Sequence, residues 1–99
     1  MAAKDEAKRY LGDAAPEMCF WLNNGPILKN LEELANALPE MSSETFHHHV
    51  NSEKNDFSSW IKDVIGDQKL ANDLLSSNNR YSVLQKVRNR LNSLKKKAG

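Results

Sequence analysis

Length, composition and charge limit what this chain can be. It has 99 residues, of which 39% are hydrophobic and 27% charged, with four glycines, three prolines and a single cysteine, Cys19. These values are typical of one small globular domain, too short for a separate catalytic subdomain and too apolar for wholesale disorder. No stretch resembles a signal peptide or reaches the roughly 20 apolar residues of a membrane span. We therefore expect a cytoplasmic protein that does not enter a membrane and is stabilised by packing instead of disulfides.

Charge is distributed unevenly along the chain. All 13 acidic residues lie in residues 1–79 together with seven basic ones, which gives this segment a net charge of −6. Residues 80–99 hold the other seven basic residues and no acidic ones, so the total is 7 − 6 = +1. Such an asymmetry indicates either an interaction tail or a segment that docks on its own acidic body.

The N-terminal part of the chain offers little to bury. Residues 1–15 are polar and alanine-rich, and we expect a mobile lead-in with one helical turn over residues 5–10. The single domain should then occupy residues 16–97. It should begin with a very short β-hairpin near residues 19–29, or simply an extended turn there, because two apolar stretches flank an Asn-Gly pair, Asn24-Gly25.

Two helices are expected next. Asn30 begins a capping pattern in which Glu33 can return a hydrogen bond to the backbone, and the leucines that follow share one face until Pro39 ends the helix. Ser42 or Ser43 can cap the second helix, which is only two to three turns long.

Three further helices complete the predicted fold. Asn55 or Asp56 caps the first of them, and Gly66 stands where a left-handed residue would end it. Asp67 begins the next, and the last and longest spans about residues 80–96. The sequence therefore predicts an all-α fold, a compact bundle of about five helices.

The most distinctive motif lies where the second and third predicted helices meet. It reads Phe-x-x-His-Val followed by Asn-Asp-Phe-x-x-Trp, over residues 46–60. Together with the segment LKNLEELANAL, this motif resembles an uncharacterised family of small archaeal and bacterial helical proteins, a domain of unknown function. The resemblance covers about residues 20–75 and implies a helical module without implying a reaction.

The three consecutive histidines, His47, His48 and His49, do not predict a metal site. Consecutive helical residues point about 100° apart, so they cannot converge on one ion, and a pairing of His49 with Glu53 lacks further ligands. His49 instead shares the apolar face of its helix, where we expect a half-buried histidine that donates a hydrogen bond to the Asn55-Asp56 helix start. We expect no metal and no cofactor.

A catalytic site is not expected either. Candidate nucleophiles and bases occur only as isolated residues, and no phosphate-binding loop, paired-carboxylate signature or nucleophile elbow is present. The structural interpretation of the motif is a helical hairpin, in which the aromatic residues of both helices form the centre of the core.

The C-terminal helix is the clearest functional lead in the sequence. Leu84, Val87, Leu91 and Leu94 form an apolar stripe, and basic residues flank it on both sides. The helix could dock on its own acidic body, pair with a second copy or another protein, or bind phosphates. These three alternatives remain open at this stage.

We therefore predict a non-catalytic protein-interaction module with an unknown protein partner, and self-association remains open. A small nucleic-acid-binding protein is the alternative. The candidate interaction residues in the motif are His49, Asn55, Asp56 and Trp60. The candidate basic surface consists of Lys86, Arg88, Arg90, Lys95, Lys96 and Lys97.

Overall fold

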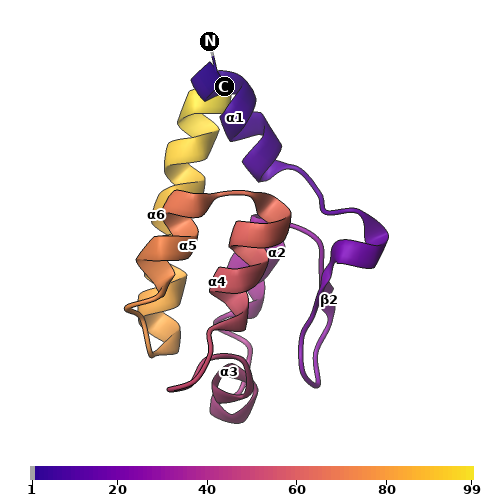
Figure 1. Ribbon diagram of the computed structural model, residues 1–99, viewed down its shortest axis with the longest axis vertical. Helices are drawn as coiled ribbons and strands as arrows, with labels where there is room; N and C mark the ends of the chain where they lie inside the picture. The colour runs from indigo at the N-terminus through magenta and orange to yellow at the C-terminus, as the bar shows by residue number, and fades with distance from the viewer. Residues whose placement is uncertain (1) are drawn as a thin grey trace.

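The computed structural model describes residues 2–99, with side chains from residue 4 onward, and shows a helical fold with one small hairpin (Figure 1). Its elements in chain order are α1 (Ala2–Leu11), η1 (Pro16–Met18), β1 (Phe20–Trp21), β2 (Ile27–Leu28), α2 (Leu31–Ala37), α3 (Ser43–His49), α4 (Asp56–Trp60), η2 (Ile61–Ile65), α5 (Gln68–Leu74) and α6 (Arg80–Ala98). The predicted all-α bundle with a very short hairpin is confirmed. No helix among the described residues is long and apolar enough to cross a membrane.

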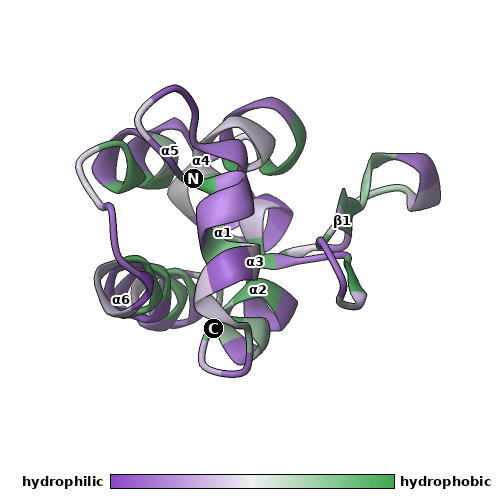
Figure 2. Cartoon of the chain, turned by 90° about the horizontal axis from the view of Figure 1, so that it is seen from below, coloured by the Kyte–Doolittle hydropathy of each residue, from purple (hydrophilic) through white to green (hydrophobic). Residues whose placement is uncertain are grey.

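The hairpin consists of two antiparallel strands of two residues each. Phe20 pairs with Leu28 and Trp21 with Ile27, and a turn closes when the Gly25 N–H donates to the carbonyl of Leu22. A Cβ at position 25 would lie 2.8 Å from the end of the Leu22 side chain, which would have to shift to accommodate it. Figure 2 shows the hairpin standing to one side of the helices.

Helices α2 and α3 begin at the capping residues that the sequence indicates. The Asn30 side chain accepts from the Glu33 N–H at 2.8 Å, and Ser42 accepts from the Thr45 N–H at 3.1 Å. The Glu33 carboxylate accepts from the N–H of Lys29, one residue before the cap. Each cap satisfies a backbone N–H that the helix itself leaves without a partner.

The expected helix before Gly66 is present, but it changes geometry halfway. Asn55 caps α4, and η2 continues it as a π-helix in which the Gly66 N–H bonds to the carbonyl of Ile61 at 2.7 Å. Gly66 has φ 89°, the left-handed conformation predicted for it. Asp67 then caps α5 by accepting from the Leu70 N–H. Periodicity did not reveal the π segment, because one wider turn leaves the apolar pattern nearly unchanged.

Helix α1 is more extensive than the single turn predicted over residues 5–10. It runs antiparallel to α6 and packs against it, so that its start and the end of α6 lie at the same end of the molecule (Figure 1). Ala7 is only 1% exposed, and Tyr10 packs against the core. A helix with few large side chains can be held this way when an alanine permits close approach. The predicted mobility of residues 1–15 and the domain boundary at residue 16 remain predictions.

The interior is built from side chains of every α-helix, of η2 and of the inner hairpin face. Phe20 from the hairpin lies 5.0 Å from Phe57 and 5.8 Å from Trp60, measured between ring centroids. Helix α6 contributes a buried face that differs from the predicted stripe only at its start, where Val83 is fully buried and Leu84 is only half-buried. The rest of the predicted stripe, Val87, Leu91 and Leu94, is buried as expected.

Candidate functional site

His49 lies at the junction of the hairpin, α3 and α4. Its ring is 5% exposed, and its Nε2 accepts a hydrogen bond from the backbone N–H of Asn23 at 3.0 Å. Nε2 therefore carries no proton, so Nδ1 carries it and donates to Asp56 Oδ2 at 2.9 Å. The predicted hydrogen bond from His49 to the start of α4 is confirmed, although the ring is more deeply buried than expected. This neutral histidine connects the hairpin to α4.

Asp56 accepts a second hydrogen bond at the same oxygen, and this donor is a cation. Lys54 Nζ lies 3.0 Å from Oδ2, and the carboxylate sits in the first turn of α4. Burial by itself would raise the pKa of Asp56, but the hydrogen bonds from His49 and Lys54 outweigh it, and the pKa lies below its ordinary value. The carboxylate thus remains ionised and stabilises the helix start.

The other two motif residues also make internal contacts. The Asn55 side chain accepts from the Ser58 N–H and donates to the carbonyl of Leu74 at 3.0 Å, which attaches α4 to the end of α5. Trp60 is 7% exposed, and its Nε1 donates to the carbonyl of Met18 at 2.8 Å. The motif therefore positions the hairpin against the helices, and His49 and Trp60 present almost no surface to a partner.

The basic residues of α6 divide into two groups. Arg90 belongs to the internal group: its Nε and Nη2 donate to both oxygens of Asp67, at 2.7 and 3.0 Å. The Asp67 side chain is 1% exposed and that of Arg90 is 13% exposed. The hydrogen bonds to Asp67 raise the pKa of Arg90 above its ordinary value, so the guanidinium stays charged.

Three more cations of α6 contact the body of the protein. Lys86 Nζ bonds to the carbonyl of Asp73 at 2.8 Å and to the Ser77 hydroxyl at 2.6 Å, at the end of α5. Lys95 pairs with Glu32 at 2.7 Å, and Arg80 donates to the carbonyl of Met41. Of the alternatives for this helix, docking on its own acidic body is therefore what the structure shows.

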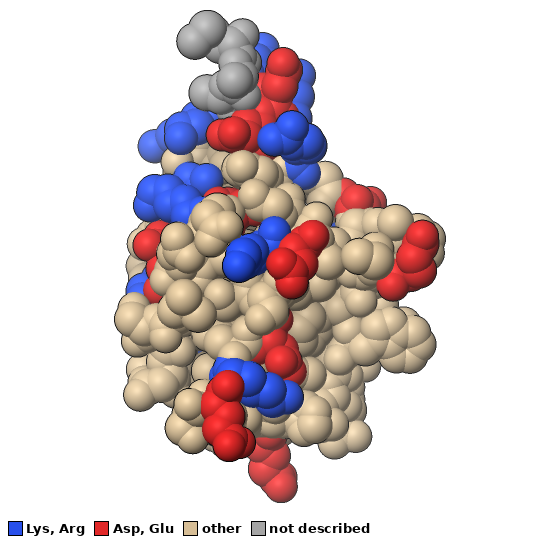
Figure 3. Space-filling view, viewed as in Figure 1, with Lys and Arg blue, Asp and Glu red and all other residues tan. Residues whose placement is uncertain are grey.

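The second group consists of the basic residues of α6 that remain exposed without an internal contact in residues 4–99. Arg88, Lys96 and Lys97 are exposed, and no ion pair to them occurs among the described residues. In Figure 3 blue side chains gather at the upper end of the molecule, where α1 and the end of α6 lie, and the hairpin side is mostly uncharged. The structure brings Lys86, Arg90 and Lys95 into internal contacts, although the Lys95 side chain stays 55% exposed.

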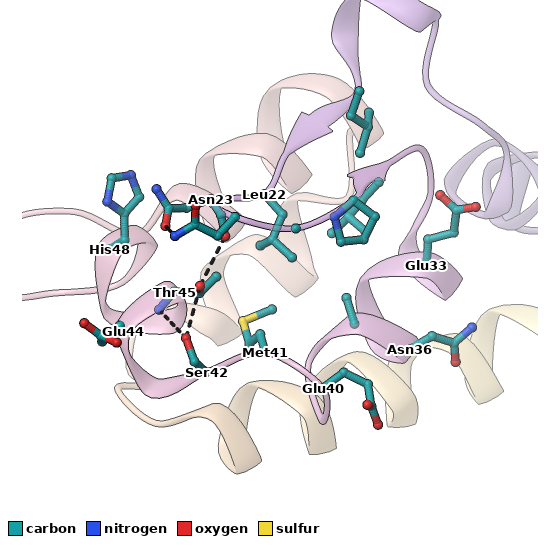
Figure 4. A pocket seen from close by; sticks show the side chains of 16 residues that line it. Leu22, Asn23, Glu33, Asn36, Glu40, Met41, Ser42, Glu44, Thr45 and His48 are labelled. Carbon is teal, nitrogen blue, oxygen red and sulfur yellow. Dashed lines mark hydrogen bonds between the residues drawn. The ribbon is translucent and has the colours of Figure 1, made fainter.

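A groove that the sequence did not reveal lies between the hairpin turn and helices α2 and α3 (Figure 4). Its volume is about 880 Å³, and Leu22 and Met41 point toward each other at its centre. The Thr45 hydroxyl fixes one wall by donating to the carbonyl of Asn23 at 3.1 Å. The lining residues are Leu22, Asn23, Asn24, Gly25, Pro26, Ile27, Leu28, Glu33, Asn36, Ala37, Glu40, Met41, Ser42, Glu44, Thr45 and His48.

Two exposed apolar side chains stand on the hairpin beside this groove. Trp21 is 72% exposed and its cross-strand partner Ile27 is 49% exposed. Adjacent strand residues point to opposite faces, so the pairing that buries Phe20 and Leu28 directs Trp21 and Ile27 outward. The only sequence signal for this surface was the tryptophan in the predicted hairpin, because the pattern could not say which face of a two-residue strand is covered.

The comparison with family models decides the assignment of this chain. A family of unknown function (DUF5752) matches residues 18–96. The chain belongs to the DUF5752 family. No curated protein and no solved structure matches it.

The matched region of this DUF5752 domain contains the hairpin, the groove and nearly all of α6, whereas α1 lies before it. The membership confirms the resemblance to a family of unknown function and supplies no activity. Metal binding by His49 and Glu53 has no support from the geometry, because both ring nitrogens of His49 are engaged by Asn23 and Asp56. Within residues 4–99 no group of three or more side chains is arranged to hold a metal ion.

Proposed function

We propose that this DUF5752 domain is a non-catalytic protein-interaction module, and that its partner binds the hairpin and the adjoining groove. The observation that carries the proposal is the exposed cross-strand pair of Trp21 and Ile27 beside an open groove of about 880 Å³. Tryptophan is enriched among the residues that contribute most to binding at protein interfaces. An exposed tryptophan next to a concave surface is a typical arrangement for such an anchor.

The hairpin is held in place before any partner arrives, which supports the proposal. His49 and Thr45 hold Asn23 from α3, and Trp60 holds Met18 from α4. Phe20 packs on the aromatic core from the opposite face. A surface that is already ordered loses less conformational entropy on binding, which favours affinity. In this proposal the motif residues position the interface and do not touch the partner.

The alternative, nucleic-acid binding, has a smaller surface available to it. Its candidates are now Arg88, Lys96 and Lys97, since Lys86, Arg90 and Lys95 contact the protein itself. Phosphate binding by the remaining cations would be lost steeply as salt increases. Replacing all three by glutamine would abolish such binding and leave a hairpin-mediated protein contact unchanged.

The test uses partner capture followed by a measurement with the purified partner. A tagged chain is expressed in its native cell, co-purifying proteins are identified by mass spectrometry, and the candidate is produced separately for titration calorimetry. Trp21→Ala should weaken its binding by about thirtyfold or more, the effect of losing an interface anchor. Tyr81→Ala is the matched control, because Tyr81 is an aromatic residue with the same exposure, 71%, away from the hairpin.

Two results would refute the proposal. Equal affinity of the wild type and Trp21→Ala for the purified partner would remove the hairpin from the interface. Salt-sensitive binding of a nucleic acid that Arg88→Gln/Lys96→Gln/Lys97→Gln abolishes, with no protein partner recovered, would favour the alternative.

A further inference from the structure

We infer that the groove receives a short basic segment of the partner protein, with an apolar side chain over Leu22 and Met41 and cationic side chains beside Glu40 and Glu44. This inference rests on the proposed function and names the chemistry of the partner. It depends on the shape of the groove, on its charges and on what the rest of the chain does with its own cations.

The size of the groove suits a peptide segment. A volume of about 880 Å³ is within the range of clefts that take ligands or a few residues of chain, roughly 300 to 1,000 Å³. The groove is partly open to solvent, so a segment can lie across it without being enclosed on all sides. At its centre are the side chains of Leu22 and Met41, which are 7% and 6% exposed. They offer a limited apolar contact, to which Ile27, 49% exposed in the same lining, adds.

The charges around the groove have one sign. Its lining includes Glu33, Glu40 and Glu44 and contains no lysine or arginine. Glu33 is partly satisfied within the chain, because it accepts from the N–H of Lys29 and lies 4.0 Å from the ammonium group of the same residue. Glu40 and Glu44 are exposed, and neither forms an ion pair with any described residue.

Two acidic side chains outside the groove are paired with cations of α6, whereas others, such as Glu53 and Asp63, form no ion pair with any described residue. Glu32, on the same helix as Glu33, pairs with Lys95, and Asp67 pairs with Arg90. The basic C-terminal helix therefore neutralises other faces of the body and leaves the groove acidic. A groove with unpaired carboxylates at its rim and an apolar centre is complementary to a segment in which lysine or arginine flanks an apolar residue.

Polar groups in the groove complete the recognition surface. The amide side chains of Asn24 and Asn36 line it, and both residues are exposed. Side-chain amides can donate to and accept from a peptide backbone, which suits an extended segment whose own N–H and C=O groups need partners. The basic side chains of the partner segment would set its orientation in the groove, and its backbone contacts would fix its position along the groove.

The experiment is an amide chemical-shift titration of the full chain with three short synthetic peptides. Leucine alternates with lysine in the first, with serine in the second and with glutamate in the third. The lysine peptide should shift amides lining the groove, and the glutamate peptide should not. The double substitution Glu40→Gln/Glu44→Gln should weaken lysine-peptide binding by between about twofold and thirtyfold, the range for losing two exposed ion pairs.

A matched control removes the same charge from elsewhere. Glu53→Gln/Asp63→Asn also replaces two exposed carboxylates, neither of which lines the groove, and should leave lysine-peptide binding within experimental error of the wild type. If both double variants weakened binding equally, the peptide would be responding to net charge, and the inference would be wrong.

The remaining outcomes separate this inference from the proposed function. Equal binding of the serine and lysine peptides in the groove would overturn the basic character of the partner and leave the groove as a docking site. No groove shifts with any peptide would overturn the inference, while the Trp21→Ala measurement would still decide the proposed function. Groove shifts that grow with protein concentration alone would identify a second copy as the occupant and also overturn it.

Discussion

Helix α6 and the β-hairpin differ in what their conspicuous side chains contact. In α6 the cations Lys86, Arg90 and Lys95 bond to α5, to Asp67 and to α2. In the hairpin, Trp21 and Ile27 extend into solvent although both are large and apolar. Most of the cations of α6 thus contact the protein itself, whereas the apolar side chains of the hairpin have free surface.

This difference shows that the type of a residue does not by itself tell whether its side chain is free to contact another molecule. A lysine on an exposed helix can be occupied by a carbonyl or carboxylate of the same chain, and its stem then covers apolar surface. A tryptophan on a two-residue strand is buried or exposed according to the face that the neighbouring helices cover. For the interaction proposed above, the contacts therefore favour the hairpin over the basic helix.

The largest expected effect on stability distinguishes Trp60, which is buried on α4, from Trp21, which is exposed on the hairpin. Trp60→Ala should lower the free energy of unfolding by about 3 to 5 kcal/mol, because it removes a buried aromatic side chain and its hydrogen bond to Met18. Trp21→Ala should change it by less than about 0.5 kcal/mol, since its side chain is exposed. Urea denaturation followed by circular dichroism measures both. Comparable losses in the two variants would contradict the contrast between the buried Trp60 of α4 and the exposed Trp21 of the hairpin.

The next effect compares two ion pairs of α6. Arg90→Ala should cost on the order of 3 kcal/mol, because it leaves the carboxylate of Asp67 buried without its partner. Lys95→Ala should cost less than about 1 kcal/mol, because Lys95 and Glu32 are both exposed. Thermal unfolding of both variants at matched salt is the measurement. An Arg90→Ala protein as stable as Lys95→Ala would show that α6 is not anchored through Asp67.

The smallest effect concerns the junction that holds the hairpin. The pKa of Asp56 is lowered in the folded state, so its contribution to stability is present above its ordinary value of 3.8 and is lost as the pH falls through the lowered pKa. Asp56→Asn should therefore flatten the pH dependence of stability in this acidic range, by less than about 1 kcal/mol because the carboxylate is one-third exposed. Urea midpoints measured from pH 2 to pH 6 test it. Identical profiles for the wild type and Asp56→Asn would exclude Asp56 as a source of acid sensitivity.

A second substitution sharpens the same measurement. Lys54→Gln removes one of the two groups that lower the pKa of Asp56, so it should reduce the pH dependence without abolishing it. The hydrogen bond from His49 remains in this variant and accounts for the residual effect. A Lys54→Gln profile as flat as that of Asp56→Asn would assign the whole effect to the lysine.

Much of the fold could be predicted from local sequence signals. Asn30, Asn55, Asp67 and Gly66 occupy the helix boundaries where they were expected, because capping and left-handed termination depend on one residue and its immediate neighbours. The contact between His49 and the start of α4 was also predictable, since seven residues and one turn separate them.

The extent of α1 was not predictable in this way. Its residues carry few large apolar side chains, and only the packing of Ala7 and Tyr10 against the distant C-terminal half of the chain accounts for their burial. Short helices are marginal by themselves, so tertiary contacts decide whether such a segment is ordered. The groove was missed for a related reason, because residues from three separate segments form it.

The chain's own sequence was sufficient for the helical class, the order of the elements, their caps and the position of the hairpin turn. Those properties depend on interactions over a few residues. Only the tertiary structure decided that Arg90 is paired with Asp67, that Trp60 is covered while Trp21 is not, and that Glu40 and Glu44 border a groove without a cation. These outcomes depend on which distant segments meet, and no local pattern of charge or hydropathy contains that information.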